Sequence, residues 1–327
     1  MRNASATLGE CLQSIANQTF RDYEVVIVDD GSSDESVSMV KEWRRRDSRI
    51  RLHRQTPLGL VAALNKGLAL ARGKYIARMD ADDIMLAHRL QVQLEFLIRY
   101  PNVHLVGTQA EVFPADNLKV GYREYIRWQN NCLTHRDIVD ELYVESPLAH
   151  PTVMVHRDVF SKLGGYRDGD FPEDYDLWLR MAREGMQFGK IPQVLLKWRD
   201  NSNRTSRIDG RYRRENFDRL RAEYLAADPR IHSTRPLVVW GAGRKTRKRV
   251  QRLGIAPALW VDVDRNKIGN RYMDAKVVNY TCLRDMAGTP DKPYVLSYVT
   301  NYGARDLIAR ELQASGFNRG DDYLMVG

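Results

Sequence analysis

The fold of this chain is decided by one stretch, GKYIARMDADD at residues 73–83. The largely apolar residues 74–79 predict a strand, and Asp80 and Asp82 follow it directly. In an extended segment, side chains two residues apart point to the same side. We therefore expect Asp80 and Asp82 to direct two carboxylates at one point beyond the strand end. Because hard divalent cations prefer oxygen ligands, this pattern predicts a metal site.

A second acidic cluster, EDYD at residues 173–176, lies just before the amphipathic run 177–182. One of its carboxylates is suited to accept a proton from an attacking group, so the two clusters together outline a site with a metal and a general base. Simpler interpretations remain open for each cluster. Residues 80–83 can cap a helix that begins near Met85. Glu173 and Asp174 can be ordinary first-turn acids that the helix dipole favours.

The bulk composition limits the class of protein. The 327 residues are too many for one comfortable core and suit two domains. No apolar run approaches the roughly 20 residues that a membrane span needs. Three cysteines, Cys11, Cys132 and Cys282, lie far apart in the sequence. This spacing favours a reducing cytosol over a disulfide framework, so we expect a cytoplasmic protein.

The chain is basic, with a formal net charge of +9 and a pI of about 9.4. Its basic residues gather at 44–54, 197–221 and 244–252. The simplest interpretation of such clusters is a solvated helix face. The next is a surface that binds anionic lipid or a diphosphate substrate. No nucleic-acid-binding motif accompanies them. We therefore expect no nucleic acid partner, and we expect any peripheral contact to be with the inner face of the membrane.

Strands and helices alternate along the N-terminal part of the chain. We expect strands at 24–28, 50–53 and 74–79, with a helix at 60–71 between the last two. This order predicts an α/β fold with a mainly parallel sheet flanked by helices, in which ligands bind beyond the carboxyl ends of strands. Asp29 and Asp30 fall at such an end, as Asp80 and Asp82 do. The segment from Asp29 to Gly31 can also be only a turn that caps the next helix.

A second alternation of strand and helix begins at Pro236. We expect a strand at 237–240, a glycine turn, a helix to Leu253 and a strand that ends at Asp262, and we assign 236–327 to a smaller Rossmann-like domain. Residues 207–235 would form a charged helical connector. The turn Gly-Ala-Gly at 241–243 lacks the third glycine of the dinucleotide fingerprint. A structural or interaction role is therefore the simpler interpretation of this domain, and nucleotide binding is the alternative. The incomplete fingerprint disfavours an NAD-dependent oxidoreductase.

Several motifs stand in one order: VVIVDDGSSD at 25–34, NKG at 65–67, GKYIARMDADD at 73–83, HPT at 150–152, GGYR at 164–167 and EDYDLWLR at 173–180. This ordered set resembles the family 2 glycosyltransferases, which are inverting enzymes of GT-A fold that use nucleotide-activated sugars. The resemblance covers residues 1–206. It implies a metal-dependent enzyme that moves a sugar from a nucleotide-diphosphate sugar, a UDP-sugar in particular, to a hydroxyl of a glycan or lipid-linked acceptor. Surface polysaccharide or lipopolysaccharide synthesis is the implied setting.

The resemblance also implies roles for individual residues. Asp82 would bind Mn²⁺ or Mg²⁺ on the diphosphate, and Asp80 would contact the ribose or a metal-bound water. Asp174 would deprotonate the acceptor hydroxyl, with Glu173 beside it. The residues expected to bind the nucleotide sugar are Asn3, Asp29, Asp30, Asn65, Asp80, Arg199 and Arg204. His150, beside Pro151, is more simply a structural residue.

The chain departs from the family pattern at two places. In the family, an apolar strand precedes a Pro-x-(Arg or Tyr)-Asn element, whereas Arg2 and Asn3 match only the end of that element. We expect either a misassigned start site or a sheet that lacks its first strand. The second explanation favours a catalytically impaired scaffold or binding protein of a glycan pathway. Asn201 stands where relatives often carry a histidine, in the segment that closes over the diphosphate.

Overall fold

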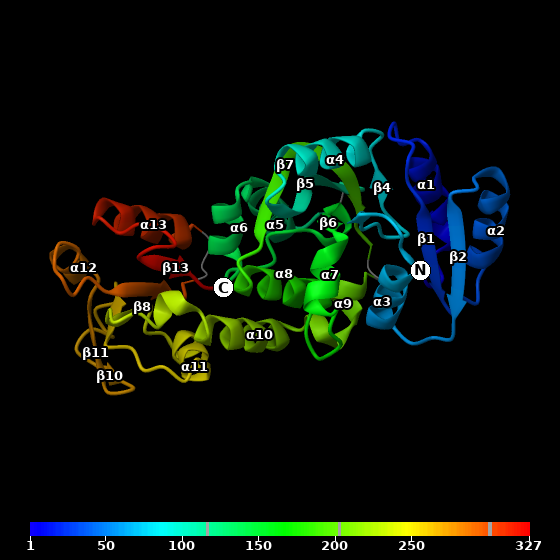
Figure 1. Ribbon diagram of the computed structural model, residues 1–327. Coiled ribbons are helices and arrows are strands. Elements are labelled where there is room, and N and C mark those ends of the chain that lie inside the picture. Colours follow the sequence, from blue (N-terminus) through cyan, green and yellow to red (C-terminus); the bar gives the residue numbers. More distant parts are fainter. Residues whose placement is uncertain (116–117, 202–203, 300–302) are drawn as a thin grey trace. The chain divides into compact units, whose positions relative to one another are not determined.

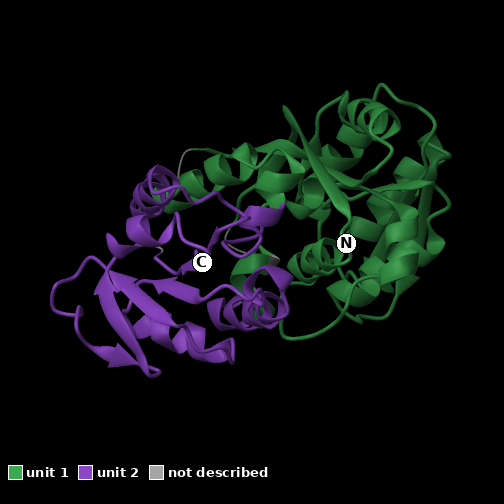
Figure 2. Ribbon diagram, turned by 60° about the vertical axis from the view of Figure 1, so that its left-hand side comes forward, with its two compact units in different colours: residues 1–138, 147–212 green, residues 139–146, 213–327 purple. Residues whose placement is uncertain are grey.

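The computed structural model describes residues 1–115, 118–201, 204–299 and 303–327 (Figure 1). The chain forms two compact units (Figure 2). The first unit contains residues 1–138 and 147–212, and the second contains residues 139–146 and 213–327. Both units combine sheets with flanking helices, which confirms the predicted α/β class.

The first unit opens with a parallel pair of strands. β1 (Val25–Asp30) pairs in register with β2 (Ile50–Gln55). Helix α3 (Leu60–Leu70) packs on β1, and α2 (Ser36–Arg46) packs on β2 and against α1 (Ser5–Ala16). Asp29 and Asp30 are thus the last two residues of β1, at the carboxyl end of the strand where the sequence predicted them.

The apolar strand that the family pattern has before Arg2 is not among the described strands. The backbone of Met1 bonds to β1 instead, since its amino group donates to the Val28 carbonyl at 2.6 Å and its carbonyl accepts from the Asp30 N–H at 2.9 Å. β1 and β2 form a sheet of their own.

The larger sheet of the first unit has the strand order β3-β6-β5-β7-β4. Its strands are β3 (Tyr75–Ala77), β6 (Met154–His156), β5 (Val103–Phe113), β7 (Gln187–Arg199) and β4 (Ile84–Met85). β5 and β7 run parallel and form the longest pairing, whereas the other neighbours are antiparallel. The helices of this part are α4 (Arg89–Arg99), α5 (Val120–Asn131), α6 (His135–Glu141), α7 (Arg157–Leu163), α8 (Glu173–Arg183) and the short α9 (Thr205–Ile208).

Helix α8 carries the second acidic cluster into the core. Its residues Tyr175, Leu177 and Trp178 are completely buried, as the amphipathic pattern predicted. The helix begins at Glu173 after Pro172, so the cluster occupies its first turn. Acidic side chains are favoured there because the helix dipole and unpaired N–H groups are positive at that end.

The second unit is built on a sheet with the order β10-β11-β9-β8-β12-β13. The strands are β8 (Leu237–Trp240), β9 (Leu259–Asp262), β10 (Arg271–Tyr272), β11 (Ala275–Asn279), β12 (Tyr294–Ser297) and β13 (Tyr323–Met325). All pairs are parallel except the hairpin of β10 and β11. From β8 the chain moves outward first to one side and then to the other, which is the order of an open doubly wound sheet.

The helices of the second unit are α10 (Arg214–Ala226), α11 (Arg244–Arg252), α12 (Cys282–Met286) and α13 (Ala304–Ala314). The sequence assigned α10 to a connector, whereas the structure includes it in this unit, together with residues 139–146. None of the described helices is both long and apolar enough to cross a membrane.

Asn65 joins two distant segments of the first unit. Its side-chain amide donates to the Tyr166 carbonyl at 2.8 Å and accepts from the Tyr166 N–H at 2.9 Å. The loop passes close to the amide, because a Cβ at Gly165 would lie 2.6 Å from the Asn65 Oδ1. Gly165 also has a φ of +77°, which favours glycine. This pair of bonds fixes the loop that leads towards α8.

Replacement of Asn65 with alanine should lower the free energy of unfolding of the first unit by roughly 1–3 kcal/mol, because both Tyr166 backbone groups lose their partner. The measurement is denaturant unfolding followed by circular dichroism. Lys66→Ala is the matched control, since Lys66 is an exposed neighbour on the same helix. Equal stability of the two variants would show that the amide does not hold this loop.

Candidate active site

The first acidic cluster lies in a turn after β3. The expectation of an extended segment through Asp82 was wrong, because β3 ends at Ala77 and the chain turns at Ala81 and Asp82. The Asp83 N–H points back to the Asp80 carbonyl, 3.4 Å away. The three carboxylates are therefore gathered by a turn and not by strand alternation.

Each carboxylate of this cluster has a different environment. Asp80 is paired with the guanidinium of Arg78, and Asp82 accepts from the Asn201 amide at 3.3 Å. Asp83 is buried, with one oxygen bonded to the Arg199 N–H at 2.8 Å and the other, Oδ2, without a hydrogen-bond partner.

Burial and mutual repulsion disfavour simultaneous ionisation of these carboxylates. Burial, with the charge of Asp80 next, raises the pKa of Asp82 above its ordinary value. The same two causes raise the pKa of Asp83 to about 8. A cation in this turn would relieve the repulsion, since an opposite charge nearby favours the ionised form.

Arg78 links the two acidic clusters. Burial opposes its charge, yet Asp80, Tyr166 and Glu173 together raise the pKa of its guanidinium. Arg78 also donates to the Met79 carbonyl, and its Nε has no hydrogen-bond partner. The charge of Asp80 in turn contributes to the raised pKa of Asp174. Charges of the two clusters therefore act on each other's ionisation through Arg78 and Asp80.

The two residues at the start of α8 differ in access. Glu173 is only 1% exposed, and the Tyr212 hydroxyl donates to both of its oxygens at 3.1 and 2.9 Å. Arg211 lies 3.9 Å from the same carboxylate. Asp174 is half-buried, and its Oδ1 accepts from the Tyr175 N–H at 2.8 Å. Glu173 is therefore held in place, whereas Asp174 is the carboxylate that a substrate can reach.

Burial, and then the neighbouring charge of Glu173, raise the pKa of Asp174 to about 8. A carboxylate with a raised pKa holds a proton more strongly, which brings its basicity closer to that needed near neutral pH. Asp176 is different, because it is fully buried and paired with Arg180 at 2.8 Å and Arg167 at 3.1 Å. Its role in α8 is structural.

His150 lies inside this cluster. Its Nε2 is 2.8 Å from the Tyr166 hydroxyl, and its Nδ1 is 3.9 Å from Glu173. Burial, and then the charge of Arg78, lower the pKa of His150 to about 3, so the ring is neutral. A neutral imidazole bonded to Tyr166 supports the surroundings of Glu173 and agrees with the simpler, structural interpretation.

The acids at the end of β1 are tied to the loops around them. Asp29 is fully buried and accepts from the Ser32 N–H at 3.2 Å, but its Oδ2 has no hydrogen-bond partner. Asp30 accepts from Gln55 and from the N–H groups of Leu58 and Gly59 at 2.7–3.0 Å. Although burial opposes ionisation, these donors lower the pKa of Asp30.

Asn3 and Asn65 are engaged within the protein. The Asn3 side chain accepts from the Ser33 N–H at 2.8 Å, so it shapes the loop after β1. Asn65 bonds to Tyr166 as described above. Both residues therefore position segments that border the acidic clusters.

The two expected phosphate-facing arginines border the first cluster. Arg199 donates to the Asp82 carbonyl at 2.6 Å, and its guanidinium lies 4.4 Å from the Phe113 ring. Arg204 lies 4.3 Å from the Trp198 ring and 3.6 Å from Asp200. Burial and Asp80 raise the pKa of Asp82 overall. The charges of Arg204 and Arg199 oppose this rise, so both arginines act on the same turn.

Sequence reasoning missed four contributors: Arg78, Asp83, Arg211 and Tyr212. Arg78 is two residues before Asp80, so a search for cations next to the acidic cluster would have found it. Tyr212 and Arg211 reach Glu173 from a segment nearly forty positions along the chain, and no local pattern marks them.

Residues 1–164 match the sequence model of glycosyl transferase family 2. The chain is 30% identical over 245 residues to the putative glycosyltransferase EpsE of Bacillus subtilis, covering 72% of this chain and 85% of the relative. It is 29% identical over 211 residues to the Escherichia coli UDP-Gal:alpha-D-GlcNAc-diphosphoundecaprenol beta-1,3-galactosyltransferase, covering 64% of this chain and 74% of the relative.

A solved structure supports the fold. Residues 1–349 of S. aureus TarS, in complex with UDP-GlcNAc, align with a TM-score of 0.54 at 13% identity over 78% of each chain. At this identity the likeness concerns the fold alone. Together with the family match, it identifies the chain as a member of glycosyl transferase family 2, a glycosyltransferase with a GT-A-type fold.

Proposed function

We propose that this glycosyltransferase moves a sugar from a nucleotide-diphosphate sugar to an acceptor hydroxyl with inversion at the anomeric carbon. The observation that carries the proposal is that Arg78 pairs with Asp80 of the first cluster, that Tyr212 holds Glu173 of the second, and that the charges of Asp80 and Glu173 both act on Arg78. One cluster faces the loop with the arginines, which suits a diphosphate, and the other offers an accessible carboxylate. The experiment that tests it is donor turnover by the full chain, with a panel of UDP-sugars tried first.

In the proposed reaction, Asp174 takes the proton from the acceptor hydroxyl. The acceptor oxygen bonds to the anomeric carbon while the bond from that carbon to the diphosphate breaks, and the nucleoside diphosphate leaves with the electron pair. Burial is the main cause of the raised pKa of Asp174, and the charge of Glu173, which Tyr212 holds in place, is the next. Arg199, which also pairs with Glu10, and Arg204 would face the negative charge that develops on the leaving group.

A divalent cation, Mn²⁺ or Mg²⁺, fits the chemistry of the first cluster. The available donors are oxygens, as hard cations require, and the repulsion between Asp80 and Asp82 disfavours their joint ionisation without a cation. Among the described residues, no three His, Cys, Asp or Glu side chains form a complete metal site. Asp82, with Asp80 beside it, would hold the cation together with the donor diphosphate. The bound metal would act as a Lewis acid on the leaving group.

Asp29 and Asp30 are proposed to contact the nucleoside. Asp29 Oδ2 is buried, lies 3.6 Å from the Nε of Arg54 and has no hydrogen-bond partner, so a ligand could still donate a hydrogen bond to it. Asn3 shapes the adjacent loop, and Asn65 holds the loop before α8. We therefore assign Asn3 and Asn65 indirect roles in donor binding.

The proposed acceptor is a glycan or a lipid-linked sugar in cell-surface polysaccharide synthesis. The printed name of the Escherichia coli relative describes a diphosphoundecaprenol-linked acceptor and a UDP-sugar donor, which supports this choice. A lipid-linked acceptor would bring the chain to the inner face of the membrane. The exposed Arg44, Arg45 and Arg46 at the end of α2 could contribute to such a peripheral contact.

Asp82→Asn should abolish Mn²⁺-dependent donor turnover while leaving the fold intact, because it removes the carboxylate charge that holds the metal. Donor hydrolysis measured against Mn²⁺ concentration, with circular dichroism as the fold check, provides the test. Asp158→Asn is the control, since the side chain of Asp158 is 79% exposed and lies outside the site. Turnover like that of the wild type at limiting Mn²⁺ would rule out the assignment of Asp82.

Asp174→Asn should lower sugar transfer by about 10²-fold or more while donor affinity stays nearly unchanged, which is the usual scale for loss of a general base. Glu184→Gln, at the exposed end of the same helix, is the control. An equal loss of donor affinity would instead assign Asp174 to the nucleotide site. Full activity of the variant would make Glu173 the base.

The pH profile should follow the raised pKa of Asp174. Because a base must be ionised to accept a proton, kcat/KM should rise as the pH increases through about 8 and fall below it. Bound metal would shift this limb to lower pH by favouring the ionised form. This rise of kcat/KM with pH should be absent from the residual activity of Asp174→Asn. A rise that persists in the variant would come from another titrating group.

A further inference from the structure

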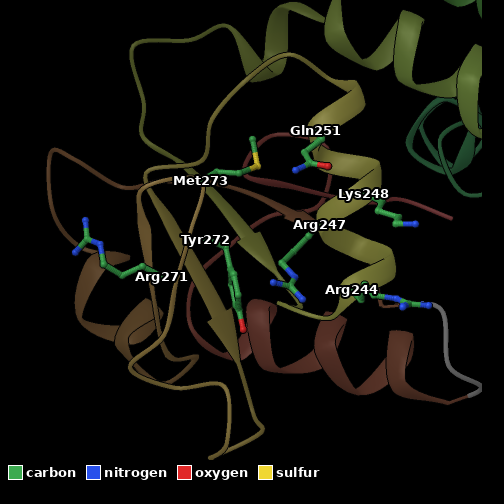
Figure 3. Close-up of a pocket in the computed structure, with 7 residues that line it drawn as sticks. All are labelled: Arg244, Arg247, Lys248, Gln251, Arg271, Tyr272 and Met273. Carbon is green, nitrogen blue, oxygen red and sulfur yellow. The ribbon is translucent and has the colours of Figure 1, made fainter.

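A pocket on the second unit is lined mainly by cationic side chains (Figure 3). Arg244, Arg247 and Lys248 of α11 lie on one side, and Arg271 and Tyr272 of β10 lie on the other. Its volume is about 400 Å³, and no acidic residue is among the described residues that line it. Pockets of this size accommodate small ligands or headgroups. We call it the cationic pocket.

The charge of α11 is neutralised on one side only. The helix reads RKTRKRVQR, so six of its nine residues are basic and none is acidic. Asp218 of α10 pairs with Arg249 at 3.3 Å and with Arg252 at 3.7 Å. The ion pairs found among the described residues include none for the basic residues of the cationic pocket. Its positive charge is therefore left for solvent or a ligand to balance.

The charges of α11 are arranged unfavourably for an isolated helix. Arg244 and Lys245 stand in the first turn, where the positive end of the helix dipole disfavours cations. Arg244 and Lys248 are also four residues apart, a spacing at which like charges repel. Violations of such local rules are expected mainly at functional sites. An anion in the cationic pocket would offset the unfavourable position of Arg244 and the repulsion between Arg244 and Lys248.

Arg247 is preorganised for an oxyanion. Its guanidinium carbon lies 3.8 Å from the centre of the Tyr272 ring, and the two side chains point toward each other in Figure 3. Tyr272 is fixed in turn, because its carbonyl accepts from the Trp260 indole at 2.9 Å. The Nε of Arg247 is buried without a hydrogen-bond partner. A stacked guanidinium keeps its in-plane N–H groups available for two phosphate oxygens.

The structure also disfavours dinucleotide binding in this unit. Asp262, at the end of β9, already accepts from the Ala242 N–H at 2.8 Å and from Lys267 at 3.2 Å. Its carboxylate is thus engaged by the turn after β8 and by the loop after β9, and is not offered to a ribose hydroxyl. A ligand of this unit would be recognised by its anionic group.

We propose that the cationic pocket binds a diphosphate group. A diphosphate carries more negative charge than a single carboxylate, so it balances the four cations of the lining better, and the stacked Arg247 supplies the directional bonds. The group can belong to a soluble diphosphate or to a lipid headgroup, because both present the same oxygens. This site lies in the second unit and is separate from the proposed donor site.

The test uses the full chain carrying Asp82→Asn in metal-free buffer, so that metal-dependent binding at the donor site is suppressed. Inorganic pyrophosphate is titrated calorimetrically at low salt. Arg247→Gln should weaken binding by about tenfold or more, because it removes a charge-assisted bidentate contact. Lys245→Gln removes an equal charge from the same helix outside the lining and should leave binding within about twofold, the scale of a screened surface charge.

A second pair of variants covers the possibility that Arg247→Gln unfolds the unit. Lys248→Gln combined with Arg271→Gln changes only exposed side chains of the same pocket. A parallel arm measures cosedimentation with phosphatidylcholine vesicles that contain a diphosphate lipid. Loss of pyrophosphate binding in the pocket variants supports a soluble source, and loss of vesicle binding alone supports a headgroup. Absence of both kinds of binding, or equal loss in Lys245→Gln, overturns the proposal.

The Asp82→Asn background only reduces binding at the donor site, and the comparison of Arg247→Gln with Lys245→Gln holds whatever the role of Asp82. Donor hydrolysis by Arg247→Gln in an otherwise unaltered chain should match that of the unaltered protein. Failure of the pocket proposal would leave the roles of Asp82 and Asp174 untouched, and failure of those roles would leave the pocket titration interpretable.

Discussion

The site depends on keeping several carboxylates close together in a half-buried region. Asp80, Asp82 and Asp83 in one turn, with Glu173 and Asp174 at the start of α8, repel one another, and burial raises most of their pKa values. The positive charge of Arg78 offsets part of this repulsion. The turn at residues 80–83, the N-terminus of α8 and the Tyr212 hydroxyl hold the carboxylates in place. Such an arrangement supports the proposal that this site takes up a cation and a proton during sugar transfer.

Much of the fold could be predicted because its signals are local. The apolar runs before Asp29 and before Asp80 gave strands, and the amphipathic run after Asp176 gave α8 with a fully buried Trp178. The ordered motifs led to the family, which the match over residues 1–164 confirms. The apolar strand that the family pattern has before Arg2 is not among the described strands, and the backbone of Met1 bonds to Val28 and Asp30 of β1.

The contacts that shape the site could not be predicted in the same way, because they join distant segments. Tyr212 reaches Glu173, and Asn65 reaches Tyr166 across 101 positions. Backbone geometry also mattered, since a turn at Ala81 and Asp82 gathers the acids that strand alternation was expected to align. Residues 139–146 belong to the second unit although residues 139–141 are the end of α6, whose first residues belong to the first unit.

The central claim is that the two acidic clusters of the first unit form one donor site with the base beside it. The most direct measurement is a crystal structure of the full chain with UDP and MnCl₂, analysed by anomalous scattering from manganese. The account predicts a manganese peak next to Asp82, with the diphosphate between it and Arg199 and with Asp174 facing the same cavity. A nucleotide bound elsewhere, or a peak away from Asp82, would contradict it.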